Sequence, residues 1–273
     1  MDGKGYIKLV KKGASHLDGK IRDDTFRTFK NDPLFWSVVQ ESSMARVLNA
    51  FTWYHDNEIM SQKASSTPGE SASSGADSTV GYVQGLNVIL APFLFVMPEL
   101  DAFTAFAVLV CRHCPRYALS VNLVGSHHAC SLVDRLLNHI DPELYKHITS
   151  KILRTEIFAF PYMTTLMACM QPLSEVIKLW DAILAFGCHF CVLLFTAHVV
   201  LLRTRLLVED SAYKLQRELT PSQNLLNADK LIKAAIAMIP YVPSDFYEEL
   251  ICHPVEKPTF EAVTKKQLSR YTV

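Results

Sequence analysis

The sequence lacks an excess of charge of either sign. Its 27 Lys and Arg residues balance its 27 Asp and Glu residues, and no basic stripe stands out along the chain. Proteins that bind nucleic acids or anionic membrane surfaces usually carry such a stripe. We therefore expect neither a nucleic-acid partner nor a membrane partner that is selected by bulk charge.

A secretory signal is also missing. Residues 1–4 (MDGK) do not begin the apolar core of a signal peptide. The seven cysteines are therefore expected to be thiols in a reducing compartment. This predicts a cytoplasmic location.

Motifs of self-contained hydrolases are absent as well. The sequence contains no GxSxG elbow, no HExxH and no GxxxxGK[ST] phosphate loop. Two CxxC pairs, at 111–114 and 188–191, are the main zinc-like pattern, but both lie in apolar helical segments and roughly 75 residues separate them. His127 and His128 with Cys130 form a weaker one. We interpret these cysteines as core thiols, and we expect no metal and no cofactor of the protein's own.

What the chain does contain is apolar residues at helical spacing. With 273 residues and 49% hydrophobic content, it can bury a sizeable core. Met44, Val47, Leu48 and Phe51 follow the i, i+3, i+4, i+7 pattern, which predicts a helix over 42–54. No alternating strand pattern appears, so the predicted fold class is all-α.

Further helices are expected downstream. Caps at Asp101, Asp141 and Asn227 and a proline at Pro243 mark four helix starts. One expected apolar face runs from Leu173 to Leu184. The expected helical regions are 101–110, 129–140, 142–148, 173–184, 189–207, 231–239 and 243–251.

Two segments are expected to lie outside this helical core. Residues 61–79 are rich in Ser, Ala, Gly and Thr and have no large apolar residue, which predicts a flexible loop. Residues 254–273 are expected to form a C-terminal tail, which leaves 1–253 as the domain. Residues 1–20 contain one apolar cluster, Ile7, Leu9 and Val10, and do not resemble a complete domain start.

The run from Ala182 to Leu202 allows two interpretations. It has 21 residues without formal charge, close to the length of a membrane span. Gly187 interrupts it, and His189 and His198 lie inside it. These features favour a buried central helix, with no membrane insertion.

Two polar stretches are candidates for function. In residues 81–87 (GYVQGLN), Gln84 stands between two glycines and before an apolar run, so the side chain is expected to be presented outward. The alternative is a glycine-punctuated loop that enters a buried helix. In residues 21–29, Asp24 and Arg27 are spaced i, i+3, which suits the holding of a guanidinium group or, alternatively, a simple surface ion pair.

These stretches carry a resemblance to a known family. Residues 21–27 (IRDDTFR) match an IxxDxxR motif, residues 82–84 (YVQ) match YxQ, and residues 179–181 (LWD) follow in the same order. The chain resembles the TBC domain, the GTPase-activating module for Rab-like small GTPases, over roughly residues 16–250. The implied fold is a two-lobed, multi-helical domain.

The resemblance also implies a mechanism. Arg27 would reach the phosphates of a GTP held with Mg²⁺ by a Rab/Ras-like GTPase, and Gln84 would orient the attacking water. Asp24 would fix the approach of Arg27, while Tyr82, Gly85 and Asn87 would support the site.

Some features make the implied cellular role more specific, and one argues against catalytic activity. Residues 32–33, 81–92, 140–142 and 176–181 are similar to the fungal spindle-checkpoint member, which restrains mitotic exit and septation with a scaffold subunit at the spindle pole body. TBC domains usually begin with helices that carry an RxxxW motif, and nothing before Ile21 supplies it. A shortened domain favours the alternative function, a non-catalytic scaffold that binds the GTPase or a bridging partner.

Overall fold

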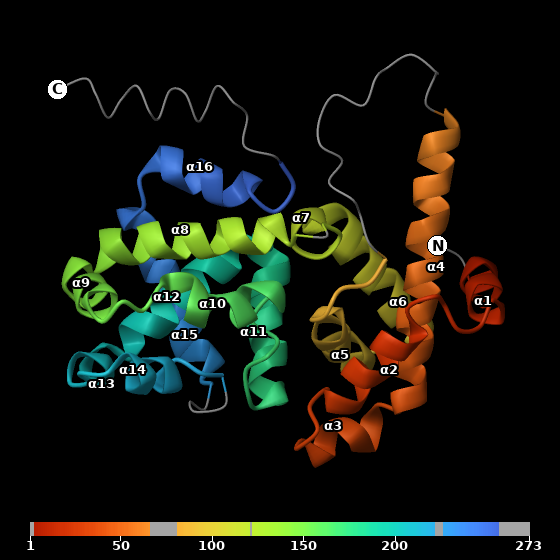
Figure 1. The fold of residues 1–273 in the computed structure, drawn as a ribbon, viewed down its shortest axis with the longest axis horizontal. Helices are drawn as coiled ribbons and strands as arrows, with labels where there is room; N and C mark the ends of the chain where they lie inside the picture. Colours follow the sequence, from red (N-terminus) through yellow and green to blue (C-terminus); the bar gives the residue numbers. More distant parts are fainter. Residues whose placement is uncertain (1–2, 66–80, 121, 222–225, 257–273) are drawn as a thin grey trace.

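Helices arranged in two lobes make up the described part of the protein. The structure is a computed structural model that describes residues 3–65, 81–120, 122–221 and 226–256. Within these ranges the chain forms helices and no β-strand. The helices up to α7 form one lobe and those from α8 onward form the other, side by side (Figure 1). The predicted all-α, two-lobed architecture is confirmed.

The helices follow one another along the chain in two groups. The N-terminal lobe contains α1 (Gly3–Lys11), α2 (Asp18–Arg27), α3 (Pro33–Val38), α4 (Glu41–Ser65), α5 (Leu86–Val96), α6 (Glu99–Val108), a π-helical segment η1 (Leu109–His113) and α7 (Pro115–Ala118). The C-terminal lobe contains α8 (Val124–Ile140), α9 (Pro142–Ser150), α10 (Thr155–Thr164), α11 (Leu173–Phe186), α12 (Phe190–Leu201), α13 (Arg203–Leu207), α14 (Ala212–Glu218), α15 (Ala228–Met238), η2 (Ile239–Tyr241) and α16 (Ser244–Cys252).

Helix α4 is the support of the N-terminal lobe. The predicted apolar face at 44, 47, 48 and 51 is completely buried, and α1, α2, α5 and α6 all pack against this helix. Helix α4 continues to Ser65, so the predicted start of a loop at residue 61 is wrong. Polar residues such as Ser61, whose hydroxyl donates to the Asn57 carbonyl at 2.9 Å, are compatible with a helix. The rest of that predicted loop, 66–79, lies outside the described residues.

The N-terminal apolar cluster forms a helix that packs on α4. In α1, Tyr6 and Leu9 are buried, whereas Ile7 is 53% exposed. The Tyr6 hydroxyl donates to the Glu99 carboxylate at 2.6 Å, and Arg46 Nε donates to the same carboxylate oxygen at 2.7 Å. One carboxylate therefore joins α1, α4 and α6. The apolar cluster read from the sequence, Ile7, Leu9 and Val10, missed the buried face, which runs through Tyr6 and Leu9 and leaves Ile7 exposed.

Helix α12 is the centre of the C-terminal lobe. Its residues from Phe190 to Val199 are buried, and α8, α10 and α15 pack around it. The expected single helix over 189–207 is wrong, because α12 ends at Leu201 and the short α13 begins at Arg203. Arg203 and Arg205 bring charge into the second half, and Arg203 Nε donates to Asp141 at 2.8 Å instead of entering the core.

The uncharged run at 182–202 is divided between two helices. Helix α11 ends at Phe186, and Gly187 follows with φ 106°, a conformation that favours glycine. None of the helices that the structure describes combines the length and the hydropathy of a membrane span. The burial of α12 agrees with the central-helix interpretation.

The predicted caps are confirmed in two places. Asp141 Oδ1 accepts a hydrogen bond from Leu144 N at 3.0 Å, and Asn227 Oδ1 accepts one from Lys230 N at 2.9 Å. The predicted cap at Asp101 is wrong. Helix α6 already begins at Glu99, directly after Pro98, so Asp101 lies within the first turn.

One predicted core position on α11 is also wrong. Leu184 is 54% exposed, whereas its neighbour Ile183 is buried. Val176, Leu179 and Ile183 mark the face of α11 that meets the core, and Leu184 lies about 100° round the helix from Ile183, at the edge of that face.

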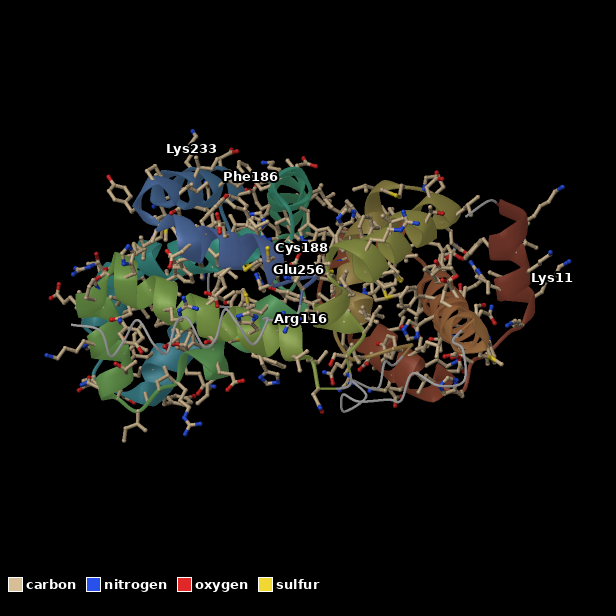
Figure 2. All side chains as sticks on the ribbon, turned by 90° about the horizontal axis from the view of Figure 1, so that it is seen from above. Lys11, Arg116, Phe186, Cys188, Lys233 and Glu256 are labelled. Atoms are coloured by element: carbon tan, nitrogen blue, oxygen red, sulfur yellow. The ribbon has the colours of Figure 1, made fainter. Side chains whose placement is uncertain are left out.

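The two CxxC pairs meet despite their separation in sequence. A hydrogen bond with the Cys188 thiol, together with burial, raises the pKa of the Cys114 thiol well above its ordinary value. Cys188 lies near the junction of the two lobes (Figure 2). The residues described by the structure contain no group of three or more His, Cys, Asp or Glu arranged to hold a metal ion. The distance between the two pairs in the sequence therefore did not predict their distance in the fold.

Two buried histidines make the fold sensitive to acid. His198 on α12 is 7% exposed, and its Nε2 has no hydrogen-bond partner among the described residues. His253 is 2% exposed, with Nε2 at 2.6 Å from the Tyr117 hydroxyl. Burial lowers the pKa of His198 to about 4 and that of His253 to about 3. Both imidazoles are therefore neutral in the folded protein at physiological pH.

Lowering the pH from 7.5 to 5 should reduce the free energy of unfolding by about 2 kcal/mol for each of these histidines. An unfolded histidine takes up a proton near pH 6.5, whereas the folded one does so only at its lowered pKa. The stabilisation is thus complete above pH 6.5 and is lost as the pH falls. Urea unfolding followed by circular dichroism at both pH values measures the loss.

The variant His198→Leu should show a pH effect smaller by about 2 kcal/mol than the native protein. His113→Leu, at an exposed position of η1, is the control and should leave the effect unchanged. If both variants keep the full pH effect, His198 does not contribute to it.

Candidate functional site

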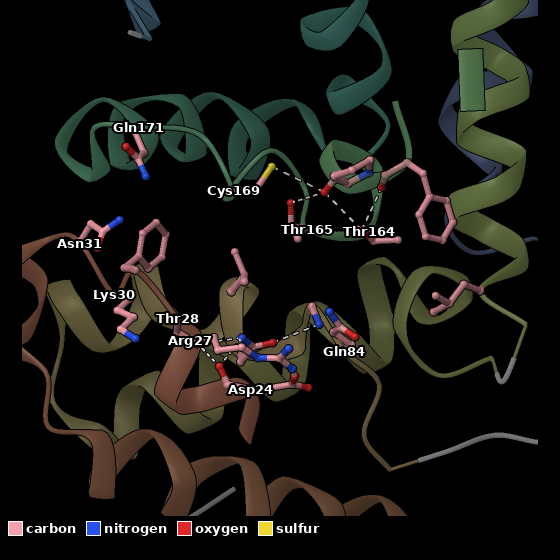
Figure 3. Close-up of a pocket in the computed structure, with 17 residues that line it drawn as sticks. Asp24, Arg27, Thr28, Lys30, Asn31, Gln84, Thr164, Thr165, Cys169 and Gln171 are labelled. Carbon is pink, nitrogen blue, oxygen red and sulfur yellow. Dashed lines mark hydrogen bonds and ion pairs between the residues drawn. The ribbon is translucent and has the colours of Figure 1, made fainter. Parts of the chain in front are cut away.

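An open cavity lies between the two lobes. Its volume is about 690 Å³. One wall is formed by the end of α2 and by residues 84–88 at the start of α5, and the opposite wall by α10 and the loop that follows it (Figure 3). Both stretches that the sequence singled out therefore lie at one cavity.

Helix α2 places Arg27 at the cavity from its last turn. Arg27 Nη2 donates to Asp24 Oδ1 at 2.6 Å, and Arg27 Nε donates to the Asp23 carbonyl at 3.2 Å. The Arg27 side chain is 63% exposed, whereas that of Asp24 is 4% exposed. A buried carboxylate thus holds an exposed guanidinium, and the remaining N–H donors of Arg27 stay available.

A second donor secures the buried carboxylate. The Tyr82 hydroxyl, from the segment before α5, donates to Asp24 Oδ2 at 2.9 Å. Burial, and then the negative charge of Asp24, raise the pKa of Tyr82 well above its ordinary value, so that the hydroxyl remains a donor. Both oxygens of Asp24 are therefore paired, as a buried charge requires.

Asn87 fastens the end of α2 to the start of α5. Its Nδ2 donates to Thr28 Oγ1 at 2.8 Å and to the Asp24 carbonyl at 3.3 Å. Its Oδ1 accepts the backbone N–H of Gly85 at 3.0 Å. Through these contacts, one side chain fixes the backbone next to both Arg27 and Gln84.

Gln84 is exposed, in agreement with its expected outward presentation. Its amide makes no hydrogen bond with other described residues, and it stands beside Arg27 on the same wall (Figure 3). The alternative, a glycine-punctuated loop entering a buried helix, also describes the segment correctly, because α5 begins at Leu86. The two interpretations are compatible, since the buried helix anchors the exposed amide.

Gly85 is required at its position for two reasons. Its φ is 108°, which side chains with a Cβ rarely adopt, and a Cβ would lie 3.3 Å from the Thr164 carbonyl of the opposite wall. The close approach of the two walls thus depends on the missing side chain.

The opposite wall was not anticipated from the sequence. It is lined by Phe160, Pro161, Thr164, Thr165, Cys169 and Gln171. The Thr165 hydroxyl donates to the Pro161 carbonyl at 2.7 Å, within its own helix. No motif or unusual spacing distinguishes these residues, so nothing in the sequence could have assigned them to the site.

Trp180 supports this wall from behind. It is a packing residue, because it is 3% exposed and its Nε1 donates to the Leu166 carbonyl at 3.0 Å. Leu166 and Met167 have φ values of 49° and 64°, and Phe29 and Leu123 at the cavity have 44° and 49°. Such conformations are costly for these residues and cluster at functional sites.

The chemistry of the cavity is that of hydrogen-bond donors. A guanidinium and a carboxamide stand side by side on one wall (Figure 3). Burial raises the pKa of the Cys169 thiol to about 12, which keeps it protonated at neutral pH. The exposed guanidinium and carboxamide can bind an anion and position a water molecule.

Comparison with known proteins identifies related chains. The sequence model of the Rab-GTPase-TBC domain matches residues 71–207, a range that includes Gln84 but not Arg27. The putative mitotic check point protein BUB2 of Dictyostelium discoideum is 36% identical over 92% of this chain and 61% of its own length. The mitotic check point protein BUB2 of Saccharomyces cerevisiae is 34% identical over 91% of this chain and 77% of its own.

A solved structure shares the fold. The Ypt/Rab-GAP domain of Gyp1p superposes with a TM-score of 0.68 at 18% identity, covering 87% of this chain and 79% of that one. The present chain spans less than two thirds of the Dictyostelium relative and about three quarters of the yeast relative.

Replacement of Gly85 by alanine should lower the free energy of unfolding by about 2 kcal/mol or more, because a left-handed conformation costs an L-residue about 1–2 kcal/mol and the new Cβ also crowds Thr164. Gly13→Ala is the matched control. Gly13 also has positive φ, 73°, but nothing lies within 4 Å of a Cβ there. Its loss should be about 1 kcal/mol. Equal losses in urea unfolding would show that the walls have room for a methyl group.

Proposed function

Because the chain belongs to the Rab-GTPase-TBC domain family, we propose that it accelerates GTP hydrolysis by a Rab-type small GTPase. The observation that carries this proposal is the convergence of Arg27 and Gln84, from two distant segments, on one open cavity. Family membership implies a small GTPase as the partner. The assignment of the two residues as catalytic is part of the proposal.

Arg27 would act on the charge that develops during phosphoryl transfer. Hydrolysis of GTP spreads negative charge over the oxygens of the transferred group, and an arginine supplied by a second protein accelerates the reaction about 10³–10⁵-fold. The Arg27 guanidinium is permanently charged and largely exposed, and Asp24 restricts its orientation. Little orientational freedom then remains to be lost when the complex forms.

Gln84 would position the attacking water. A carboxamide can accept a hydrogen bond from a water molecule through its oxygen and donate one to a phosphate through its nitrogen. The Gln84 amide is exposed and close to Arg27 (Figure 3). Neither residue needs an altered pKa for these roles, so the mechanism rests on position and charge.

The nucleotide and its Mg²⁺ would be held by the GTPase. The proposed division of labour leaves this chain without a cofactor of its own. Its contribution would be two donors inserted into a site that the partner only partly completes.

The names of two relatives support a proposal about the cellular setting of this protein. Two of these are called mitotic check point proteins. We infer a role in negative control of mitotic exit and septation, in the cytoplasm and at the spindle pole body, together with a scaffold subunit. The GTPase would be the Rab/Ras-like member of that pathway.

The first experiment is single-turnover hydrolysis of GTP by a panel of purified Rab-type GTPases, with and without this protein. Arg27→Ala should lower the stimulated rate by about 10³-fold or more, and Gln84→Ala by about 10²-fold. Both variants should keep the helical circular dichroism spectrum, because both side chains are exposed and the Tyr82 hydroxyl still donates to Asp24 when Arg27 is removed.

Arg22→Ala is the matched control for Arg27. Arg22 lies on the same helix, pairs with Asp18 at 2.7 Å and is 64% exposed, but it does not line the cavity. Its removal should leave the rate unchanged. Binding of a GTP-loaded GTPase without acceleration would contradict the proposal and support the non-catalytic scaffold. Full activity of Arg27→Ala or Gln84→Ala would remove that residue from the mechanism.

A further inference from the structure

We propose that Lys30 and Phe26 form a docking contact for the partner GTPase, and that this contact receives a carboxylate next to an apolar side chain on the GTPase surface around its nucleotide. The inference rests on the proposed function and adds to it a specificity-determining element. The two residues lie beside Arg27, but they are assigned to binding and not to the chemical step.

The charge of the cavity is unbalanced, and Lys30 is the reason. The charged residues that line it are Asp24, Arg27 and Lys30. Asp24 is already paired with Arg27 at 2.6 Å. No carboxylate in the described part of the chain lies within 4.0 Å of the Lys30 ammonium group. The wall therefore offers a positive charge that no carboxylate among the described residues neutralises, which favours an acidic group on the partner.

Phe26 gives this charge an apolar neighbour. Its side chain is 58% exposed, and the Lys30 Nζ lies 4.8 Å from the centre of its ring. A cation over an aromatic face is attracted to it, which restrains the flexible lysine at the end of α2. A single exposed phenylalanine is ordinary on a protein surface. Here it is joined to an unneutralised cation at the edge of a cavity, a combination that suits a partner with both acidic and apolar groups.

The position of Lys30 separates it from the proposed reaction centre. Thr28 is extended and Phe29 has φ 44°, so the chain turns sharply after α2 ends at Arg27. Figure 3 shows Lys30 on one side of Arg27 and Gln84 on the other. A water molecule and a phosphoryl group between Arg27 and Gln84 would lie away from Lys30. The Lys30 ammonium group would instead face the protein surface that surrounds the nucleotide.

This geometry makes a distinct kinetic prediction. An interaction present equally in the bound complex and in the transition state lowers KM and leaves kcat unchanged. A charge at the edge of an interface also makes association sensitive to salt. Arg27 and Gln84, by contrast, are expected to act on kcat.

The test compares Lys30→Met, Lys30→Glu and Phe26→Ala in the hydrolysis assay, with the most responsive GTPase of the panel, loaded with GTP, as the probe. Lys30→Met keeps an unbranched side chain and should raise KM about 5-fold, and Lys30→Glu should raise it about 30-fold or more, with kcat changed less than about 2-fold. Phe26→Ala should raise KM about 5-fold. Both Lys30 variants should also weaken the dependence of KM on salt.

Lys11→Met is the control. Lys11 is exposed at the outer end of the N-terminal lobe, far from the lobe junction (Figure 2), and its replacement should leave KM and its salt dependence unchanged. An unchanged KM for Lys30→Glu would overturn the docking assignment. A fall in kcat at constant KM would overturn it as well, because Lys30 would then act on the transferred phosphoryl group.

The docking contact can be tested separately from the proposed catalytic function. If the native protein does not accelerate hydrolysis, the same variants are compared in binding to a GTPase loaded with a non-hydrolysable GTP analogue. Weaker binding of Lys30→Glu there would retain the docking contact while excluding the catalytic role of the site. Equal binding of all variants would overturn the contact itself.

Discussion

The buried carboxylate of Asp24 is the interaction on which the candidate site depends. Its two oxygens are shared between an exposed cation, Arg27, and a buried hydroxyl, Tyr82, at 2.6 and 2.9 Å. A carboxylate removed from water is tolerated only when such partners replace its hydration. The same interaction joins α2 to the segment before α5. Positioning of the guanidinium and docking of two chain segments are therefore one structural event.

The site places exposed chemical groups on buried supports. The guanidinium and the carboxamide are exposed, whereas Asp24, Tyr82 and Asn87 are all buried. Rigid support of this kind reduces the entropy that must be lost when a reacting complex forms. It also explains why the motif residues differ so much in exposure. In the proposed mechanism the exposed residues contact the partner GTPase, and the buried residues hold the exposed ones in position.

The two lobes determine the width of the cavity. The edge of Phe93 on α5 packs against Trp180 on α11, with ring centroids 5.3 Å apart, and Trp180 also holds the Leu166 carbonyl behind the opposite wall. Gly85 and Thr164 also approach closely across the cavity, since a Cβ on Gly85 would lie 3.3 Å from the Thr164 carbonyl. The LWD segment is thus a structural brace for the site. Its tryptophan takes no part in lining the cavity.

The helical class, the caps at Asp141 and Asn227, and the outward presentation of Gln84 were predictable from the sequence alone. These follow from local periodicity and from hydrogen bonds between near neighbours, which short windows contain. Helix ends were predicted less well, as α4 and α12 show. Polar residues can lie inside a helix or beyond it, so packing against the rest of the chain determines where the helix ends.

Which surfaces meet depends on the packing of the whole chain. Packing brought Thr164 opposite Gly85 and placed Cys188 beside Cys114, and it left Lys30 at the cavity without a carboxylate partner among the described residues. An apolar stripe indicates that a helix face is covered but does not identify what covers it. That choice is made by the packing of the whole chain, between residues that no local pattern connects.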